Sequence, residues 1–166
     1  MQFKTRHIMM LIAVLLFVML VGCTGSQQTT EDQYPEDFNF VFSYGVQTKN
    51  KIDTFENTYT KDLIIDGLIE VSFELTGEEK KRIYEKMQDI HLFDYPEYSA
   101  GVSSEPSQGY IFVIEHNGEQ QTVGWGGGFT NKKRDREFQS LVNMIIEIIE
   151  SHEEYKSLPE AKGGYL

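Results

Sequence analysis

Apolar and polar residues alternate in the first half of the chain in a pattern that predicts strands. Phenylalanines at every second position from Phe38 to Phe42 predict a strand with one strongly apolar face. A polar break over 47–51 follows, and residues 52–65, rich in threonine and aromatic residues, are expected to be extended. After a turn at residues 66–67, the alternating apolar residues of 69–75 predict a third strand with one solvated face.

The apolar period becomes helical in two later segments. Thr76 and Glu79 fit a capping box, in which their side chains satisfy backbone N–H groups at a helix start, so a helix is predicted over about 78–91. Near the C-terminus, large apolar residues recur at helical spacing over 138–152 and predict a long amphipathic helix that covers the sheet. The tail from Leu158 onward is expected to fray.

Between these helices, residues 110–115 and 121–125 predict two strands joined at Asn117-Gly118, a residue pair that supplies both positive φ angles of a type I′ turn. A two-residue turn sets the register, with the pairs His116 and Glu119, Ile114 and Gln121, Phe112 and Val123, and Tyr110 and Trp125. The order β-β-β-α-β-β-α predicts an α+β domain, with an antiparallel sheet of about five strands and two helices packed on one face.

The N-terminal segment has the pattern of an export signal. Lys4 and Arg6 form a basic start, and residues 8–21 contain no polar side chain. With the next two residues, the apolar segment would span roughly 24 Å as a helix at about 1.5 Å per residue, short of the roughly 30 Å hydrocarbon core of a bilayer. A signal peptide is therefore favoured over a permanent transmembrane helix.

The end of this segment, Leu20-Val21-Gly22-Cys23, resembles the lipobox of bacterial lipoproteins. The resemblance implies that a diacylglyceryl group is attached to the Cys23 thiol and that a signal peptidase cleaves between Gly22 and Cys23. It also implies a protein anchored by lipid at the extracytoplasmic face of the cell membrane. Cys23 is the only cysteine of the chain, so no internal disulfide competes for its thiol.

These features divide the chain into three parts. Residues 1–22 are the predicted signal peptide, 23–37 the lipidated cysteine with a flexible polar stalk, and 38–166 a single α+β domain. Loss of the signal would leave 13 Lys and Arg against 26 Asp and Glu, a net charge of about −13. Such a charge makes nucleic acid an unfavourable partner and opposes adsorption of the domain to anionic lipids.

The exported part is similar to small bacterial lipoproteins whose exported domain has no assigned function. The similarity lies in four short segments: Tyr44-Gly45, Asp53-Thr54-Phe55, Tyr59-Thr60-Lys61-Asp62 and Phe93-Asp94-Tyr95-Pro96. It implies no active site.

Motifs of catalysis and metal binding are missing from the sequence. No G-x-S-x-G occurs, and His91, His116 and His152 lack the spacing that places two imidazoles on one helix face toward zinc. Structural roles are favoured for these histidines, and no cofactor or metal is predicted.

A glycine run followed by basic residues is the segment most like a phosphate site. Gly126, Gly127, Lys132 and Lys133 would form it, with strand, loop and helix start in that order. The favoured alternative is that the glycines let the strand end in a twisted edge or bulge.

Asp53, Asp62 and Asp66, in or beside the extended segments, are candidates for calcium binding or acid–base chemistry. No EF-hand spacing supports them. In a hydrolase, the catalytic acid would be drawn from these three or from Glu70.

The polar loop over 96–109 is longer than most loops of compact domains, which indicates either disorder, the favoured interpretation, or a binding loop. As a binding loop it would use Tyr95, Tyr98, Ser103 and Ser104.

The sequence therefore predicts a non-enzymatic binding or interaction domain at the cell envelope, with an unknown envelope protein as possible partner. The alternative is a cell-envelope hydrolase or an inhibitor of one.

Overall fold

The computed structural model describes residues 34–96, 108–126 and 132–165, all of which belong to one compact unit. In chain order its elements are β1 (Asn39–Val46), β2 (Asn50–Asp53), β3 (Thr58–Asp62), β4 (Leu68–Ser72), α2 (Gly77–Asp89), the 3-10 helix η1 (Leu92–Asp94), β5 (Gln108–His116), β6 (Glu119–Gly126), α3 (Lys133–Ser151) and α4 (Glu153–Lys156).

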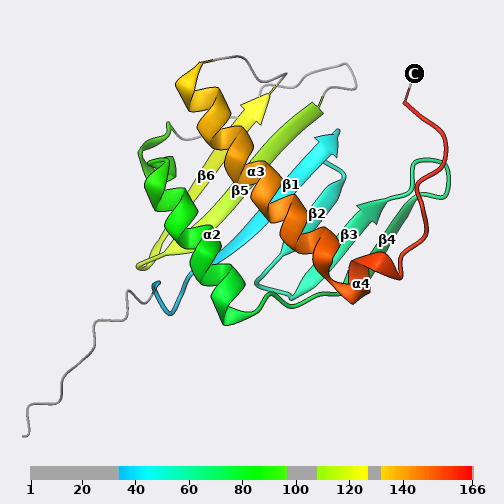
Figure 1. The fold of residues 1–166 in the computed structure, drawn as a ribbon, viewed down its shortest axis with the longest axis horizontal. Coiled ribbons are helices and arrows are strands. Elements are labelled where there is room, and N and C mark those ends of the chain that lie inside the picture. Colours follow the sequence, from blue (N-terminus) through cyan, green and yellow to red (C-terminus); the bar gives the residue numbers. More distant parts are fainter. Residues whose placement is uncertain (1–33, 97–107, 127–131, 166) are drawn as a thin grey trace, which may run out of the picture. The chain divides into compact units, whose positions relative to one another are not determined.

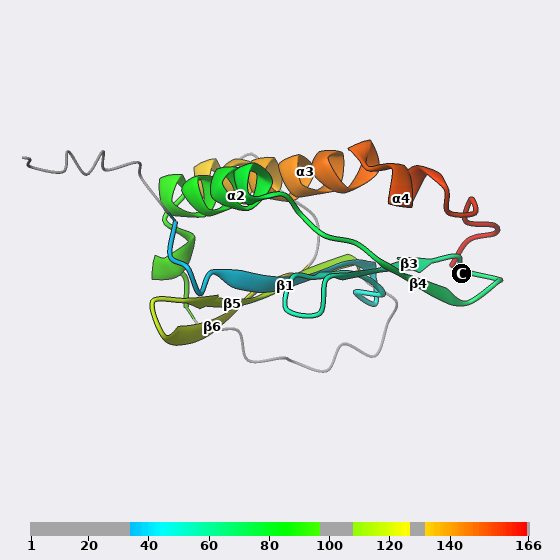
Figure 2. The same ribbon diagram turned by 90° about the horizontal axis from the view of Figure 1, so that it is seen from below.

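The six strands form one antiparallel sheet in the order β4-β3-β2-β1-β5-β6 (Figure 1). The first four strands form a meander, and the chain then crosses through α2 to add β5 and β6 on the other side of β1. The helices α2, α3 and α4 lie on the same face of the sheet (Figure 2). The α+β class predicted from the sequence is confirmed, with six strands in place of about five.

The additional strand arises because a turn divides the predicted extended segment 52–65. The Asp53 carboxylate accepts hydrogen bonds from the backbone N–H groups of Phe55 and Glu56, at 3.1 and 3.2 Å, and Asn57 adopts a positive φ of 52°. Aspartate and asparagine favour such turns because their side chains bond nearby backbone groups. The segment therefore becomes the hairpin of β2 and β3.

The predicted β5–β6 hairpin is confirmed in its turn and its register. Asn117 and Gly118 both have positive φ angles, of 52° and 75°. The four predicted cross-strand pairs, from His116 with Glu119 to Tyr110 with Trp125, all occur. Two residues at the turn thus determine which side chains of these strands reach the core.

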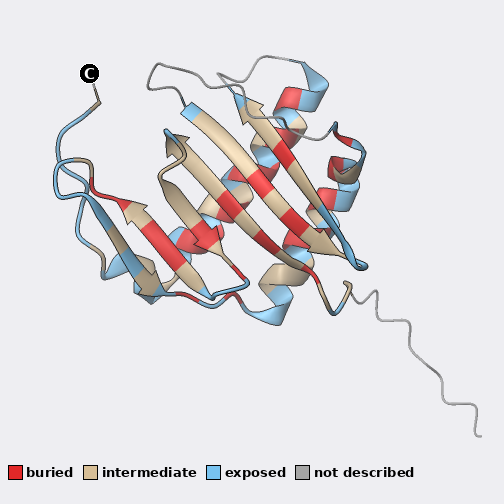
Figure 3. Cartoon of the chain, turned by 180° about the vertical axis from the view of Figure 1, so that it is seen from behind, coloured by how far each residue is buried: buried red, intermediate tan, exposed pale blue. Residues whose placement is uncertain are grey.

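The core lies between the sheet and the helices, and it is built largely from aromatic rings of the central strands. Phe42 of β1 and Phe112 of β5 are fully buried and stack with their ring centroids 4.3 Å apart. Phe138 of α3 meets the Phe112 ring edge-on, at 5.9 Å. The buried positions alternate along β1 and β5, as expected for strands covered on one face (Figure 3).

Both long helices were predicted, with shifted ends. The capping box at Thr76 and Glu79 is present, and α2 ends at Asp89, two residues before the expected end. Helix α3 begins at Lys133, ahead of the apolar spacing, and ends at Ser151 because His152 has extended backbone angles, φ −76° and ψ 144°. A short helix, α4, follows that break.

The chain joins the domain before residue 38. The ring of Tyr34 lies edge-on to Phe38, with centroids 5.9 Å apart. The Asp37 carboxylate accepts the backbone N–H groups of Asn117 and Gly118, at 3.0 and 2.6 Å. These bonds, the Gly118 one foremost, hold the pKa of Asp37 below its usual value. The last residues of the predicted stalk are therefore tied to the β5–β6 turn.

The expectation that the tail from Leu158 frays is wrong for the described residues up to 165. The Lys162 backbone N–H donates to the Leu63 carbonyl at 3.2 Å, and the Ile65 N–H donates to the Lys162 carbonyl at 3.4 Å. The Lys162 ammonium also lies 3.2 Å from the Asp66 carboxylate. The tail is docked on the turn between β3 and β4.

Candidate functional site

The docked tail and the β3–β4 turn form a compact surface that we name the β3–β4 corner, defined as residues 62–68 with residues 162–165. The turn closes with a 2.8 Å bond from the Leu63 N–H to the Gly67 carbonyl. Ile64 has a left-handed φ of 64°, which is rare for a β-branched residue. The tail contacts therefore hold the turn in a conformation that its own sequence does not favour.

Asp62, one of the four acids singled out from the sequence, is the buried centre of this corner, with 9% of its surface exposed. Its carboxylate accepts hydrogen bonds from the Tyr165 phenol and from the Ile64 N–H, the latter at 2.9 Å. The Tyr165 oxygen in turn accepts from the Lys49 ammonium at 2.9 Å. A buried carboxylate, a phenol and an ammonium thus form one connected chain.

The charges of Asp62 and Lys49, linked through the Tyr165 hydroxyl, stabilise each other. The hydrogen bond to the Tyr165 oxygen raises the pKa of Lys49 above its usual value, and the Asp62 charge adds to the shift. Lys49 also lies 4.6 Å from the centroid of the Tyr165 ring, within the range of a cation–π contact. The Asp62 carboxylate is bonded to groups of this same protein, Tyr165 and Ile64. These bonds hold the C-terminal tail in place.

The other three acids each have their own partner, and only Asp66 belongs to the corner. Asp53 caps the β2–β3 turn and lies 3.7 Å from the Lys51 ammonium. Asp66 pairs with Lys162, and Glu70 accepts a 3.0 Å hydrogen bond from the Thr60 hydroxyl. Among the described residues, no three His, Cys, Asp or Glu side chains gather where they could hold a metal ion.

The corner also carries exposed apolar side chains. Ile65 is 72% exposed and Leu68 is 59% exposed, whereas Phe55, in the β2–β3 turn, is 38% exposed. Ile65 and Leu68 stand on either side of the Asp66-Gly67 turn. Exposed apolar residues that cluster in this way are typical of contact sites, whereas single ones are ordinary.

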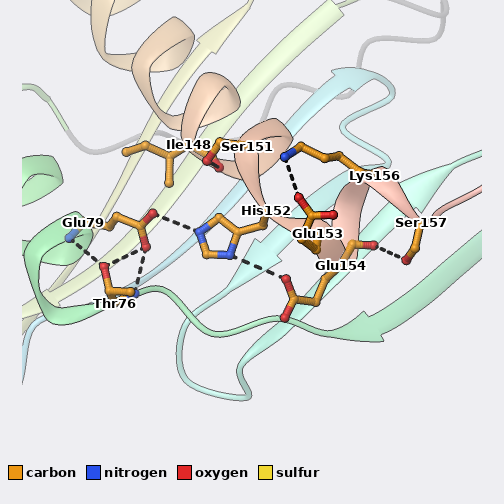
Figure 4. Close-up of polar contacts among 9 residues, drawn as sticks. All are labelled: Thr76, Glu79, Ile148, Ser151, His152, Glu153, Glu154, Lys156 and Ser157. Carbon is orange, nitrogen blue, oxygen red and sulfur yellow. Dashed lines mark hydrogen bonds and ion pairs between the residues drawn. The ribbon is translucent and has the colours of Figure 1, made fainter.

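A second polar cluster joins the start of α2 to the break between α3 and α4 (Figure 4). The His152 Nε2 atom lies 2.9 Å from the Glu79 carboxylate, and Nδ1 lies 3.8 Å from that of Glu154. Glu79 also accepts from the Thr76 backbone N–H at 2.9 Å. The His152 ring lies on Phe73, with centroids 4.5 Å apart. This cluster connects helix ends, which supports the structural role predicted for His152.

The Glu79 carboxylate gives this cluster a pH dependence. Burial acts to raise its pKa, but the hydrogen bonds from the Thr76 N–H and from His152 outweigh burial, so the folded pKa lies below the usual value of 4.5. The ionised carboxylate therefore favours the folded state, with full effect above pH 4.5, and the effect is lost as the pH falls through the folded pKa. We expect Glu79→Gln to lower the free energy of unfolding by about 1 kcal/mol at pH 6 and progressively less in acid.

Urea denaturation at a series of pH values checks this expectation. The exposed Glu78, in the same helical turn, supplies the control Glu78→Gln. A Glu79→Gln effect that is equally large at pH 3 would contradict the assignment.

Tyr95, predicted to belong to a possible binding loop, is packed inside the domain. Tyr95 is 7% exposed, the Arg134 guanidinium lies 3.7 Å from its ring centroid, and Trp125 lies 6.1 Å away. Trp125 itself stacks on Phe138 at 4.8 Å. Among the described residues, the buried Tyr95 hydroxyl has no hydrogen-bond partner. Several predicted site residues lie outside the described residues: Gly22, Cys23, Tyr98, Ser103, Ser104 and Gly127.

The predicted anion segment is described only at its two ends. Gly126 is exposed at the end of β6, and Lys132 precedes the first turn of α3. Lys133 forms an ion pair with Glu137, at 3.5 Å. The described residues therefore place one of the two lysines beside an acid of its own helix.

Comparison with known proteins returns nothing similar: no protein family model, no curated protein and no solved structure matches the chain. Within the described residues, no helix has the length and apolar character needed to cross a membrane.

Sequence reasoning missed four residues: Ile65, Leu68 and Tyr165 of the corner, and Lys49, which bonds to Tyr165. A signal existed for two of them, because Ile65 and Leu68 are large apolar residues directly beside an Asp-Gly turn, where polar residues are usual. No local pattern marks the other two.

Proposed function

We propose that this protein is a bacterial lipoprotein, anchored at the extracytoplasmic face of the cell membrane by lipid on Cys23, whose α+β domain binds an envelope protein and performs no catalysis. The lipobox, in frame after a basic and then apolar segment, supports the anchor. Acyl chains on one cysteine supply the two or more anchors that stable attachment needs.

The observation that carries the binding function is the exposed apolar pair Ile65 and Leu68 on a corner held rigid by the docked tail. Burial of apolar surface is the main source of affinity between proteins. A rigid contact surface loses little conformational entropy on binding. The candidate acids support binding over catalysis because each already has a structural partner.

The position of the corner favours a protein over the bilayer as its partner. The described chain begins at Tyr34, beside the β5–β6 turn to which Asp37 is bonded. The β3–β4 corner lies at the opposite ends of the strands from the start of β1 (Figures 1 and 2). A tether that enters at one end leaves the other end free to meet proteins. Anionic headgroups would also repel so acidic a chain.

One experiment in bacterial cells tests both parts of the proposal. Cells that express the full chain are fed a clickable fatty acid and then treated with a protein crosslinker. We expect label on the wild type and none on Cys23→Ala, because the thiol is the site of acylation. Label retained by Cys23→Ala would refute the anchor.

The crosslinked samples from the same cells report on binding. We expect a discrete adduct of the wild type to disappear when Ile65 and Leu68 are both changed to lysine. The control is Phe55→Lys, which adds charge at an exposed apolar residue outside the corner and should leave the adduct unchanged. An adduct that survives the double change would show that the corner is not the contact surface.

A further inference from the structure

β4 is an edge strand whose outer side is free within the described residues. It pairs only with β3, and the sheet ends there. The Phe73 N–H bonds to the Asn57 carbonyl and the Leu63 N–H to the Gly67 carbonyl, so Gly67 and Phe73 are hydrogen-bonded positions. Such positions alternate along an antiparallel pair. The residues between them at even numbers therefore direct their N–H and C=O groups outward: Leu68, Glu70 and Ser72.

Natural proteins usually protect such an edge with lysine, proline or a bulge. β4 has none of these: its sequence is Leu-Ile-Glu-Val-Ser, and its pairing with β3 is regular. Its first residue, Leu68, is 59% exposed, and Ile65 lies just before it. The edge thus combines unpaired backbone groups with exposed apolar side chains, which is the combination that a strand-forming partner recognises.

The charges along this edge identify the partner's chemistry. Residues 66–74 contain three acids, Asp66, Glu70 and Glu74, and no lysine or arginine. Glu70 lies within β4, whereas Asp66 lies in the turn before the strand and Glu74 lies two residues after its end. All three acids are exposed; Asp66 pairs with Lys162 and Glu70 accepts a hydrogen bond from the Thr60 hydroxyl. A partner strand beside these acids needs basic side chains.

A second copy of this chain fits the edge poorly. Antiparallel pairing of two β4 strands in the register that uses all three outward residues puts Leu68 beside Ser72 and Glu70 beside Glu70 of the other copy. Like charges directly opposite each other in a sheet are destabilising. The chain between Cys23 and the domain is also unsuited, because its only charged residues are acids.

We propose that β4 accepts an extended, basic segment of a partner protein as a seventh strand of the sheet. This inference rests on the proposed binding function. It specifies that backbone hydrogen bonds of β4 form part of the contact with the partner. The outward N–H and C=O groups of β4 pair with the segment. Lysine or arginine side chains of the segment lie beside Glu70 and Glu74, and its apolar side chains lie beside Ile69 and Val71.

The test uses the full chain in detergent micelles and a short synthetic peptide of alternating lysine and valine. A matched peptide carries a methyl group on every backbone nitrogen, so its charge is the same but it has no backbone N–H group to donate to an edge. Fluorescence anisotropy of labelled peptides measures binding, and amide hydrogen exchange locates it. We expect the methylated peptide to bind roughly tenfold more weakly or worse, and the unmethylated peptide to slow exchange in residues 66–74.

On the protein side, Ser72→Pro removes one outward N–H without changing the charge. Proline is tolerated on an edge strand when its position faces solvent. We expect Ser72→Pro to weaken binding of the unmethylated peptide and Ser72→Ala to leave it unchanged. The peptide comparison does not depend on how well the proline variant folds.

Equal binding of the two peptides, or no binding of either, would overturn strand addition. So would a well-folded Ser72→Pro protein that binds normally. These outcomes leave the proposed function standing if the crosslinked adduct still depends on Ile65 and Leu68. Loss of that dependence would instead refute the binding function itself.

Discussion

Replacing Phe112 by alanine will lower the free energy of unfolding by about 3–5 kcal/mol. The ring is fully buried in the central strand pair, stacked on Phe42 at 4.3 Å and met edge-on by Phe138. Its removal takes away apolar contacts with the sheet, through Phe42, and with α3, through Phe138. It also leaves a cavity between the sheet and the long helix that these elements cannot easily fill. No other single change proposed for this chain has so large an expected effect.

Urea denaturation followed by fluorescence of Trp125, the only tryptophan, measures this loss. Trp125 stacks on Phe138, so its emission reports on the same part of the core. The control is Phe55→Ala at the partly exposed β2–β3 turn, with an expected change within about 0.5 kcal/mol. A loss below about 1 kcal/mol for Phe112→Ala would show that this core is not packed as described.

The second large effect is expected at the β3–β4 corner. Asp62→Asn should lower the free energy of unfolding by about 1.5–3 kcal/mol, the range for hydrogen bonds to charged groups. The amide keeps the shape of the side chain but loses the charge that the Tyr165 phenol and the Ile64 N–H are bonded to. The tail should then leave the turn more often, since Tyr165 is its last described contact.

Carboxypeptidase digestion measures release of the tail, and urea denaturation measures the stability. Asp66→Asn is the matched control, because Asp66 also contacts the tail but through an exposed ion pair with Lys162, worth about 0–1 kcal/mol. Equal effects of the two substitutions would mean that burial of Asp62 is not what holds the tail.

The parts of the fold that local sequence determines were predictable. Asn117 and Gly118 define a turn with only one common geometry, so the register of β5 and β6 followed by counting outward from it. The start of α2 followed in the same way from Thr76 and Glu79, whose side chains bond to groups three residues away.

The division of residues 52–65 into β2 and β3 was harder to predict. The turn depends on Asp53 bonding two backbone N–H groups and on Asn57 at positive φ, and neither interrupts the run of threonine and aromatic residues that indicates an extended chain. Residue types that favour strands lie on both sides of the turn, so composition alone predicts one continuous strand.

The corner could not be predicted because its contacts join distant parts of the chain. Lys162 and Asp66 are 96 residues apart, and Tyr165 and Asp62 are 103 apart. A polar tail that contains Gly163 and Gly164 is typical of a frayed chain end. Its local sequence does not show the surface on which it docks. Asp62 was a candidate because it is an acid in an extended segment, but no local pattern indicated the Tyr165 phenol that bonds to it.

The attachment of Asp37 to the β5–β6 turn has a mechanical consequence. Tension from the anchor would enter the sheet at the start of β1, and a partner held at the β3–β4 corner would pull at the other end of the strands. The bonds between antiparallel strands run across that direction, so many of them share the load in shear instead of opening one at a time. In the proposed arrangement, the domain would therefore bear force between the membrane and the bound partner.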